Sequence, residues 1–115
     1  MLGYDELGPY KYLLRIALDP TARDSTIDAV AKLAEYDRER SASLLATLEE
    51  FLGRRGNISA TSDALFVHPN TLRQRLRRIA DLTGIDLRRD DWLMVEIAVK
   101  MVRLRAALGA ATPYT

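Results

Sequence analysis

Apolar residues recur three or four positions apart along the chain, a spacing that places them on one face of a helix. The clearest stripe consists of Leu72, Leu76, Ile79 and Thr83. His68 is the predicted N-cap, because the residue before a proline avoids helical geometry while Pro69 loses no hydrogen bond at the first helical position. Thr83 and Gly84 are predicted to end this helix.

The face opposite this stripe is polar and basic. At about 100° per residue, the positions that point away from the stripe are Asn70, Gln74, Arg77 and Asp81, with Arg73 and Arg78 on its two shoulders. Residues 68–80 hold four arginines and no acid. Such side chains suit base edges, since arginine pairs with guanine and Asn or Gln with adenine. A solvated basic helix is the alternative interpretation.

A shorter helix is predicted directly before the basic one, with Asn57 as its N-cap. Its small or apolar residues, able to pack closely on the basic helix, are Ala60, Ala64 and Leu65. Ser59 and Thr61 lie near its start, where a hydroxyl could either cap the helix or hold a DNA phosphate. A short helix, a tight turn and a longer basic helix form the layout of a helix-turn-helix, which places its second helix in the major groove.

Two helices are predicted nearer the N-terminus. The first covers residues 8–18, and the second begins near Ser25 and ends at a polar break over residues 36–40. Their apolar faces consist of Tyr12, Leu13, Ile16 and Ala17 in the first helix and Ile27, Val30, Ala31 and Ala34 in the second. We expect the boundary between an N-terminal segment and the helix-turn-helix module at this break.

A further helix is predicted between the break and the helix-turn-helix, beginning at Ser41 or Ser43. Its buried side would consist of Leu44, Leu45, Leu48, Phe51 and Leu52. Gly56 is its expected end, because glycine readily adopts the left-handed conformation that ends many helices, and Gly53 is a competing end.

The last helix is predicted from about residue 91 to residue 108, capped by Asp90 or Asp91. Its apolar positions form one stripe of Trp92, Val95, Val99 and Val102 and a second stripe of Leu93, Ile97, Met101, Leu104 and Leu108. A helix that is apolar around so much of its circumference is central to a core or half exposed at a protein interface. We expect both roles, with the second stripe as a homodimer contact. The chain is thus predicted to be all-α, a compact bundle of about six helices.

The composition bears on cellular location and on where the charge lies along the chain. The 115 residues contain no cysteine, no long apolar run and no signal peptide, so we expect a cytoplasmic protein. The net charge is only +1, yet residues 1–53 hold six Lys/Arg against ten Asp/Glu, whereas residues 54–115 hold eleven against six. The basic excess therefore lies in the half that contains the predicted helix-turn-helix, as nucleic-acid binding requires.

The sequence gives little support to an enzyme. A single histidine without any cysteine cannot build a histidine-rich metal site or a Cys–His dyad, and no glycine-rich phosphate loop is present. We therefore expect no catalytic residues, no metal and no cofactor. The competing function is a helical protein-interaction module whose basic helix binds an acidic partner.

Four segments resemble the C-terminal helix-turn-helix of the PucR/CdaR transcription regulators, a Fis-like motif. They are Gly-Asn-Ile-Ser-Ala-Thr from residue 56, Leu-Phe-Val-His-Pro-Asn-Thr-Leu from 65, Arg-Leu-Arg-Arg-Ile from 75 and Leu-Thr-Gly-Ile-Asp-Leu from 82. The close resemblance runs from about residue 36 to residue 102. Gln74 stands where the family often has an aromatic residue.

The resemblance implies a double-stranded DNA-binding module of a transcriptional regulator, with any small-molecule effector bound by upstream domains. Residues 1–38 would be a helical segment resembling the junction with such a domain, 39–109 the DNA-binding domain and 110–115 a disordered tail. We assign base readout to Asn70, Arg73, Gln74 and Arg77. We assign backbone contacts and positioning to Asn57, Ser59, Thr61, His68, Thr71, Arg75 and Arg78.

Overall fold

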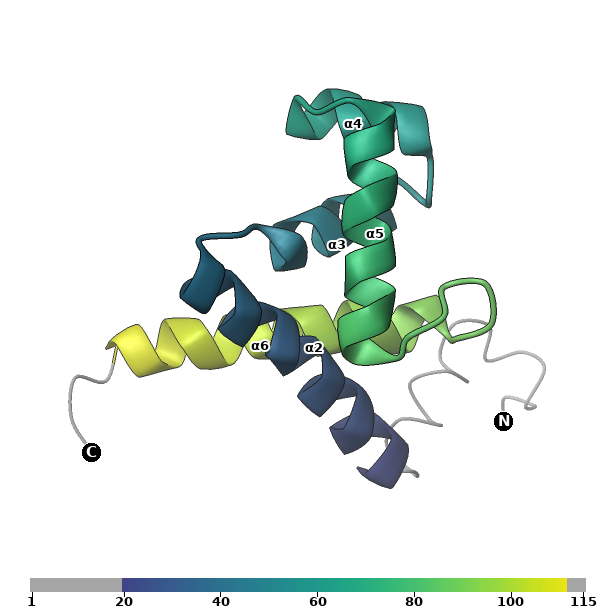
Figure 1. Ribbon diagram of the computed structural model, residues 1–115. Coiled ribbons are helices and arrows are strands. Elements are labelled where there is room, and N and C mark those ends of the chain that lie inside the picture. Colours follow the sequence, from purple (N-terminus) through teal and green to yellow (C-terminus); the bar gives the residue numbers. More distant parts are fainter. Residues whose placement is uncertain (1–19, 112–115) are drawn as a thin grey trace, which may run out of the picture.

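The computed structural model describes residues 20–111, all of whose regular elements are helices (Figure 1). They are α2 (Pro20–Arg40), α3 (Leu44–Gly53), α4 (Ile58–Leu65), α5 (Pro69–Thr83) and α6 (Trp92–Ala111). The all-α prediction is confirmed over this range, and the helix expected at residues 8–18 lies outside it. The expected tail is partly wrong, since α6 continues through Ala111; residues 112–115 are not described.

The helices pack around one core to which α2, α3, α5 and α6 all contribute. In Figure 1, α5 stands upright with α4 at its upper end, while α6 runs across its lower end and α2 passes in front of α6. Helix α2 contacts α3, α5 and α6. The largest fully buried hydrophobic side chains are Val30, Leu33, Leu48, Leu72, Ile79, Val95 and Val99. Because α5 is in contact with α2, α3 and α4, its orientation is fixed by three neighbours.

The polar break expected at residues 36–40 is wrong, because α2 continues as helix through Arg40. One of these polar residues, Asp37, caps the helix that follows. Its two carboxylate oxygens accept hydrogen bonds from the backbone N–H groups of Leu44 (2.8 Å) and Leu45 (3.0 Å). Ser43 is the N-cap of α3 by position, but its side chain makes no capping bond. Helix α2 thus caps α3 from outside, a contact that the spacing of residues within α3 does not predict.

Helix α3 ends at Gly53, the competing end in the sequence, and not at the expected Gly56. Its five expected apolar residues are all buried. After the helix, Arg55 and Gly56 both have positive φ, and the Gly56 N–H donates to the Phe51 carbonyl at 2.9 Å. Gly56 therefore takes the left-handed conformation predicted for it, but in the connection that follows the helix.

Helix α6 is capped by Asp91, whose Oδ1 accepts from the N–H of Leu93 at 3.0 Å. The stripe that begins at Trp92 is buried at Val95, Val99 and Val102, as predicted. None of the helices within residues 20–111 is long and apolar enough to cross a membrane.

Candidate nucleic-acid interface

Helices α4 and α5 are each started by the side chain predicted from the sequence. Asn57 Oδ1 accepts a hydrogen bond from the Ala60 N–H at 2.9 Å, and His68 Nδ1 accepts from the Asn70 N–H at 3.0 Å. Pro69 follows as the first residue of α5. Both predicted N-caps are confirmed, and only residues 66–68 connect the two helices.

One face of α5 anchors it in the protein. Leu72 and Ile79 are buried in this face, with Leu76 and Thr83 half-buried beside them. The Thr83 hydroxyl donates to the Ile79 carbonyl at 2.7 Å, and Gly84 ends the helix with φ of 73°. The predicted stripe and the predicted end of the helix are therefore both confirmed.

The opposite face of α5 is open to solvent. The exposed side chains are Asn70, Arg73, Gln74, Arg77, Arg78 and Asp81. Arg73 Nη1 donates to Asn70 Oδ1 at 3.3 Å, so these two neighbours preorganise one another. Within residues 20–111, no carboxylate forms an ion pair with Arg73, Arg77 or Arg78. The described protein thus leaves their positive charge without an acidic partner, and an anionic ligand would supply one.

Arg75 differs from the other arginines of α5. It is half-buried, and its Nη1 lies 3.4 Å from Thr47 Oγ1 and 3.5 Å from Ser43 Oγ, both contributed by the start of α3. The Arg75 side chain therefore links α5 to the start of α3. These contacts give Arg75 an anchoring role within the protein, which competes with the phosphate contact expected from the sequence.

Thr61 cannot contact DNA as it is placed here. Its side chain is 0% exposed, and its hydroxyl donates to the Asn57 carbonyl at 2.7 Å. Ser62, the other fully buried residue of α4, likewise donates to the Ser59 carbonyl at 3.0 Å. The phosphate role suggested for Thr61 is wrong, because the hydroxyl is buried away from solvent and its proton is donated within the protein. The residues expected to pack on α5, namely Ala60, Ala64 and Leu65, are only half-buried.

The remaining positioning residues lie at or near the starts of α4 and α5. Asn57, Ser59 and His68 are exposed, and Thr71 is half-buried. Ser59 and Thr71 each lie in the first turn of their helix, where backbone N–H groups without an intrahelical partner attract anions. The accessible predicted residues are therefore grouped along α5 and at the starts of the two helices.

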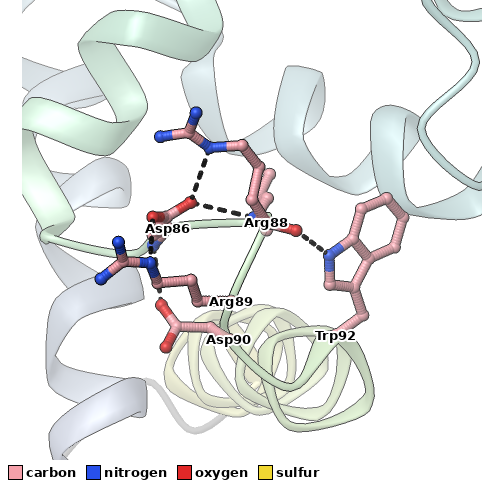
Figure 2. A network of polar contacts seen from close by, with 6 residues as sticks. Asp86, Arg88, Arg89, Asp90 and Trp92 are labelled. Atoms are coloured by element: carbon pink, nitrogen blue, oxygen red, sulfur yellow. Dashed lines mark hydrogen bonds and ion pairs between the residues drawn. The ribbon is translucent and has the colours of Figure 1, made fainter.

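The connection between α5 and α6 is held by a compact polar network (Figure 2). Asp86 Oδ1 accepts from the backbone N–H of Arg88 at 2.9 Å, and its carboxylate pairs with the guanidinium groups of Arg88 (3.4 Å) and Arg89 (3.6 Å). This backbone hydrogen bond, followed by the two arginines, lowers the pKa of Asp86 below its ordinary value of 3.8. Asp90 accepts from the Asp86 N–H at 2.7 Å. The arginines of this connection are thus paired, unlike those on the outer face of α5.

Within residues 20–111, no group of three or more His, Asp or Glu side chains is placed to hold a metal ion. The feature that stands out is a helix with one buried face and one basic, amide-bearing face, preceded by a short capped helix. This arrangement defines a helix-turn-helix protein.

The chain belongs to the family of PucR C-terminal helix-turn-helix domains, whose sequence profile matches residues 44–101. These are DNA-binding domains of transcriptional regulators. Helix α2 lies before the matched segment, although its side chains Ile27, Val30 and Leu33 are part of the same core.

Relatives include two regulators of Bacillus subtilis strain 168. The chain is 33% identical over 88 residues to the DNA-binding transcriptional activator AdeR and 36% identical over 84 residues to the proline-responsive transcriptional activator PutR. These alignments cover 76% and 73% of this chain but 21% and 20% of the relatives, so the chain spans about a fifth of their length. The carbohydrate diacid regulator of Escherichia coli K12 is 54% identical over 43 residues, which are 36% of this chain and 11% of that protein. No solved structure matches the chain.

Proposed function

We propose that the chain binds double-stranded DNA sequence-specifically, as the C-terminal module of a transcriptional regulator, with α5 lying in the major groove. The observation that carries this proposal is the outer face of α5, where exposed Arg and amide side chains have no acidic partner within residues 20–111. The buried opposite face holds the helix rigidly, so that its outer side chains are presented in a fixed register. Rigid presentation lowers the conformational entropy lost on binding.

The side chains divide into two roles under this proposal. Asn70, Arg73, Gln74 and Arg77 read base edges, where bidentate hydrogen bonds distinguish one base pair from another. Asn57, Ser59, His68, Thr71 and Arg78 contact the sugar-phosphate backbone and fix the register. Thr61 and Arg75 no longer belong to this set, because both are engaged within the protein.

Pairing of two modules is part of the proposal. The expected second stripe of α6 includes Leu104 and Leu108, which are 52% and 55% exposed. Two copies joined along this stripe would present two α5 helices to half-sites about 34 Å apart, one helical turn of DNA. A single copy should accordingly bind a single half-site weakly.

Selection of bound sequences from a random duplex pool tests the function. The selected duplex should bind on the order of 10³-fold more tightly than a shuffled duplex of the same composition at physiological salt. Equal binding to both duplexes would contradict the proposal and favour a helical module whose basic face binds an acidic protein. Salt dependence alone would not separate the two functions, since both contacts weaken with salt.

A further inference from the structure

Phe66 is an aromatic residue that the protein exposes almost completely. Its side chain is 94% accessible to solvent, and its backbone has φ of 57° and ψ of 43°, the left-handed conformation, at the end of α4. The backbone of this turn is nevertheless well ordered by hydrogen bonds. The Phe66 N–H donates to the Asp63 carbonyl at 3.2 Å, and the Val67 N–H donates to the Ser62 carbonyl at 3.0 Å.

The fold itself does not explain a phenylalanine at this position. Left-handed geometry brings Cβ close to the following carbonyl oxygen, so glycine or asparagine normally occupies such a helix end. An isolated exposed apolar residue is common and carries no conclusion by itself. Phe66 combines exposure with an unfavourable backbone conformation, and the ring stabilises nothing in exchange within the described protein.

The position of Phe66 places it beside the proposed DNA-binding face. It lies in the connection between α4 and α5, two residues before His68 and four before Asn70. Four residues span at most roughly 14 Å even when fully extended, so Phe66 is joined by a short stretch of chain to the first residue proposed to read bases. In helix-turn-helix proteins, the N-terminal residues of the second helix are those that contact bases.

We propose that the Phe66 ring packs against a thymine methyl group at the edge of the major groove, next to the bases read from the start of α5. This inference rests on the proposed DNA-binding function. The thymine C5 methyl is an apolar group that B-DNA exposes in the major groove, and a phenylalanine ring is among the side chains that contact it. Phe66 is thus a specificity residue that adds an apolar contact to the polar readout from α5.

Replacing Phe66 distinguishes a DNA contact from a structural role of the ring, because the two roles predict different changes in melting temperature and in DNA affinity. Phe66→Gly should raise the melting temperature of the chain by about 4 °C, because glycine accepts the left-handed backbone. The same variant should bind the selected duplex about tenfold more weakly, with an unchanged salt slope, because no phosphate contact is lost. Phe66→Tyr, which keeps the ring and the backbone strain, should restore most of the affinity and leave the melting temperature near that of the original chain.

A second comparison identifies the DNA group. The selected duplex is prepared with thymine and with uracil, which lacks only the methyl group, and each is titrated with the original chain and with Phe66→Gly. We expect loss of the methyl groups to weaken DNA binding by the original chain more than binding by the glycine variant. The variant already lacks the ring that would contact the methyl group, so it has less to lose. An equal uracil penalty for both proteins would overturn the assignment to a methyl group.

The controls separate failure of this inference from failure of the proposed function. If the original chain does not distinguish the selected duplex from a shuffled one, the DNA-binding proposal fails, and this inference fails with it. If the original chain discriminates but Phe66→Gly binds with undiminished affinity, the inference alone is overturned, and the DNA-binding proposal stands.

Discussion

The indole ring of Trp92 lies directly against Gly56. A Cβ atom at residue 56 would be 2.7 Å from Trp92 Cη2, closer than real contacts of this kind. The ring also packs on Phe51, with ring centroids 5.7 Å apart, and its Nε1 donates to the Leu87 carbonyl at 2.5 Å (Figure 2). Trp92 therefore joins the start of α6 to both the α3–α4 and the α5–α6 connections.

Gly56→Ala should destabilise the protein by about 2–4 kcal/mol. The cost combines a left-handed alanine, at φ of 78°, with a steric clash on a packed ring. Gly53→Ala is the matched control, because a Cβ there meets no atom within 4 Å, and it should be neutral or slightly stabilising. Chemical unfolding followed by the fluorescence of the single tryptophan measures both variants. Equal stability of the two would contradict the packing of Trp92 on residue 56.

Asn70→Ala should cost about 1–3 kcal/mol of affinity at the selected duplex while leaving binding to shuffled DNA unchanged. The side chain is exposed, and the helix start is capped by His68, so folding should be little affected. Fluorescence anisotropy on both duplexes measures the difference. An equal loss on both would remove Asn70 from base readout and place it among the backbone contacts.

Arg78→Ala should weaken binding to all duplexes and reduce the slope of log affinity against log salt by about one unit. The reason is that one fewer phosphate is neutralised and correspondingly fewer counterions are released. Arg75→Ala serves as a control on the same helix. Since Arg75 is hydrogen-bonded to α3, its loss should lower unfolding stability and leave the salt slope largely intact. An unchanged slope for Arg78→Ala would exclude a phosphate contact.

Asp86 should make the stability of the protein sensitive to acid. Its folded-state pKa is lowered, so its stabilising contribution is fully present above its ordinary pKa of 3.8 and is lost as pH falls through the folded-state value. The unfolding free energies of the original chain and of Asp86→Asn should therefore differ most near neutral pH and converge as the pH falls through the lowered folded-state pKa of Asp86. Urea titrations across this range test the expectation. A difference independent of pH would show that the carboxylate charge is not responsible.

Leu104→Glu should abolish self-association if the exposed stripe of α6 joins two copies. A charge placed in an apolar contact cannot be desolvated without a partner, so even one substitution per subunit should be disruptive. Arg105→Ala, at an exposed neighbouring position, should leave association unchanged. Sedimentation equilibrium measures both, and binding to a duplex with two half-sites should weaken only for Leu104→Glu. A monomeric original chain would contradict the pairing proposed here.

The starts and ends of helices were predictable where the signal is local. Asn57, His68 and Asp91 cap the helices that follow them, as expected. Gly84 ends α5 as the sequence predicts. Each of these signals acts between residues a few positions apart, because a capping side chain or a left-handed residue satisfies nearby backbone groups. The periodicity of α5 likewise predicted which of its faces would be buried.

Contacts between elements were not predictable in the same way. Asp37 is an ordinary polar residue in the sequence, and only the turn that follows α2 brings its carboxylate to the start of α3. Thr61 has the local position of an anion contact, yet packing buries it completely. Arg75 differs little from Arg78 in sequence, but its place on α5 directs it to α3.

The amino-acid sequence by itself determined the helical fold class, the helix-turn-helix and the polar face of α5, because these follow from periodicity and capping within single segments. The tertiary structure decided which hydroxyls and guanidinium groups remain available to a ligand. Availability depends on neighbours that lie far away in the sequence, and it is fixed only when the helices pack.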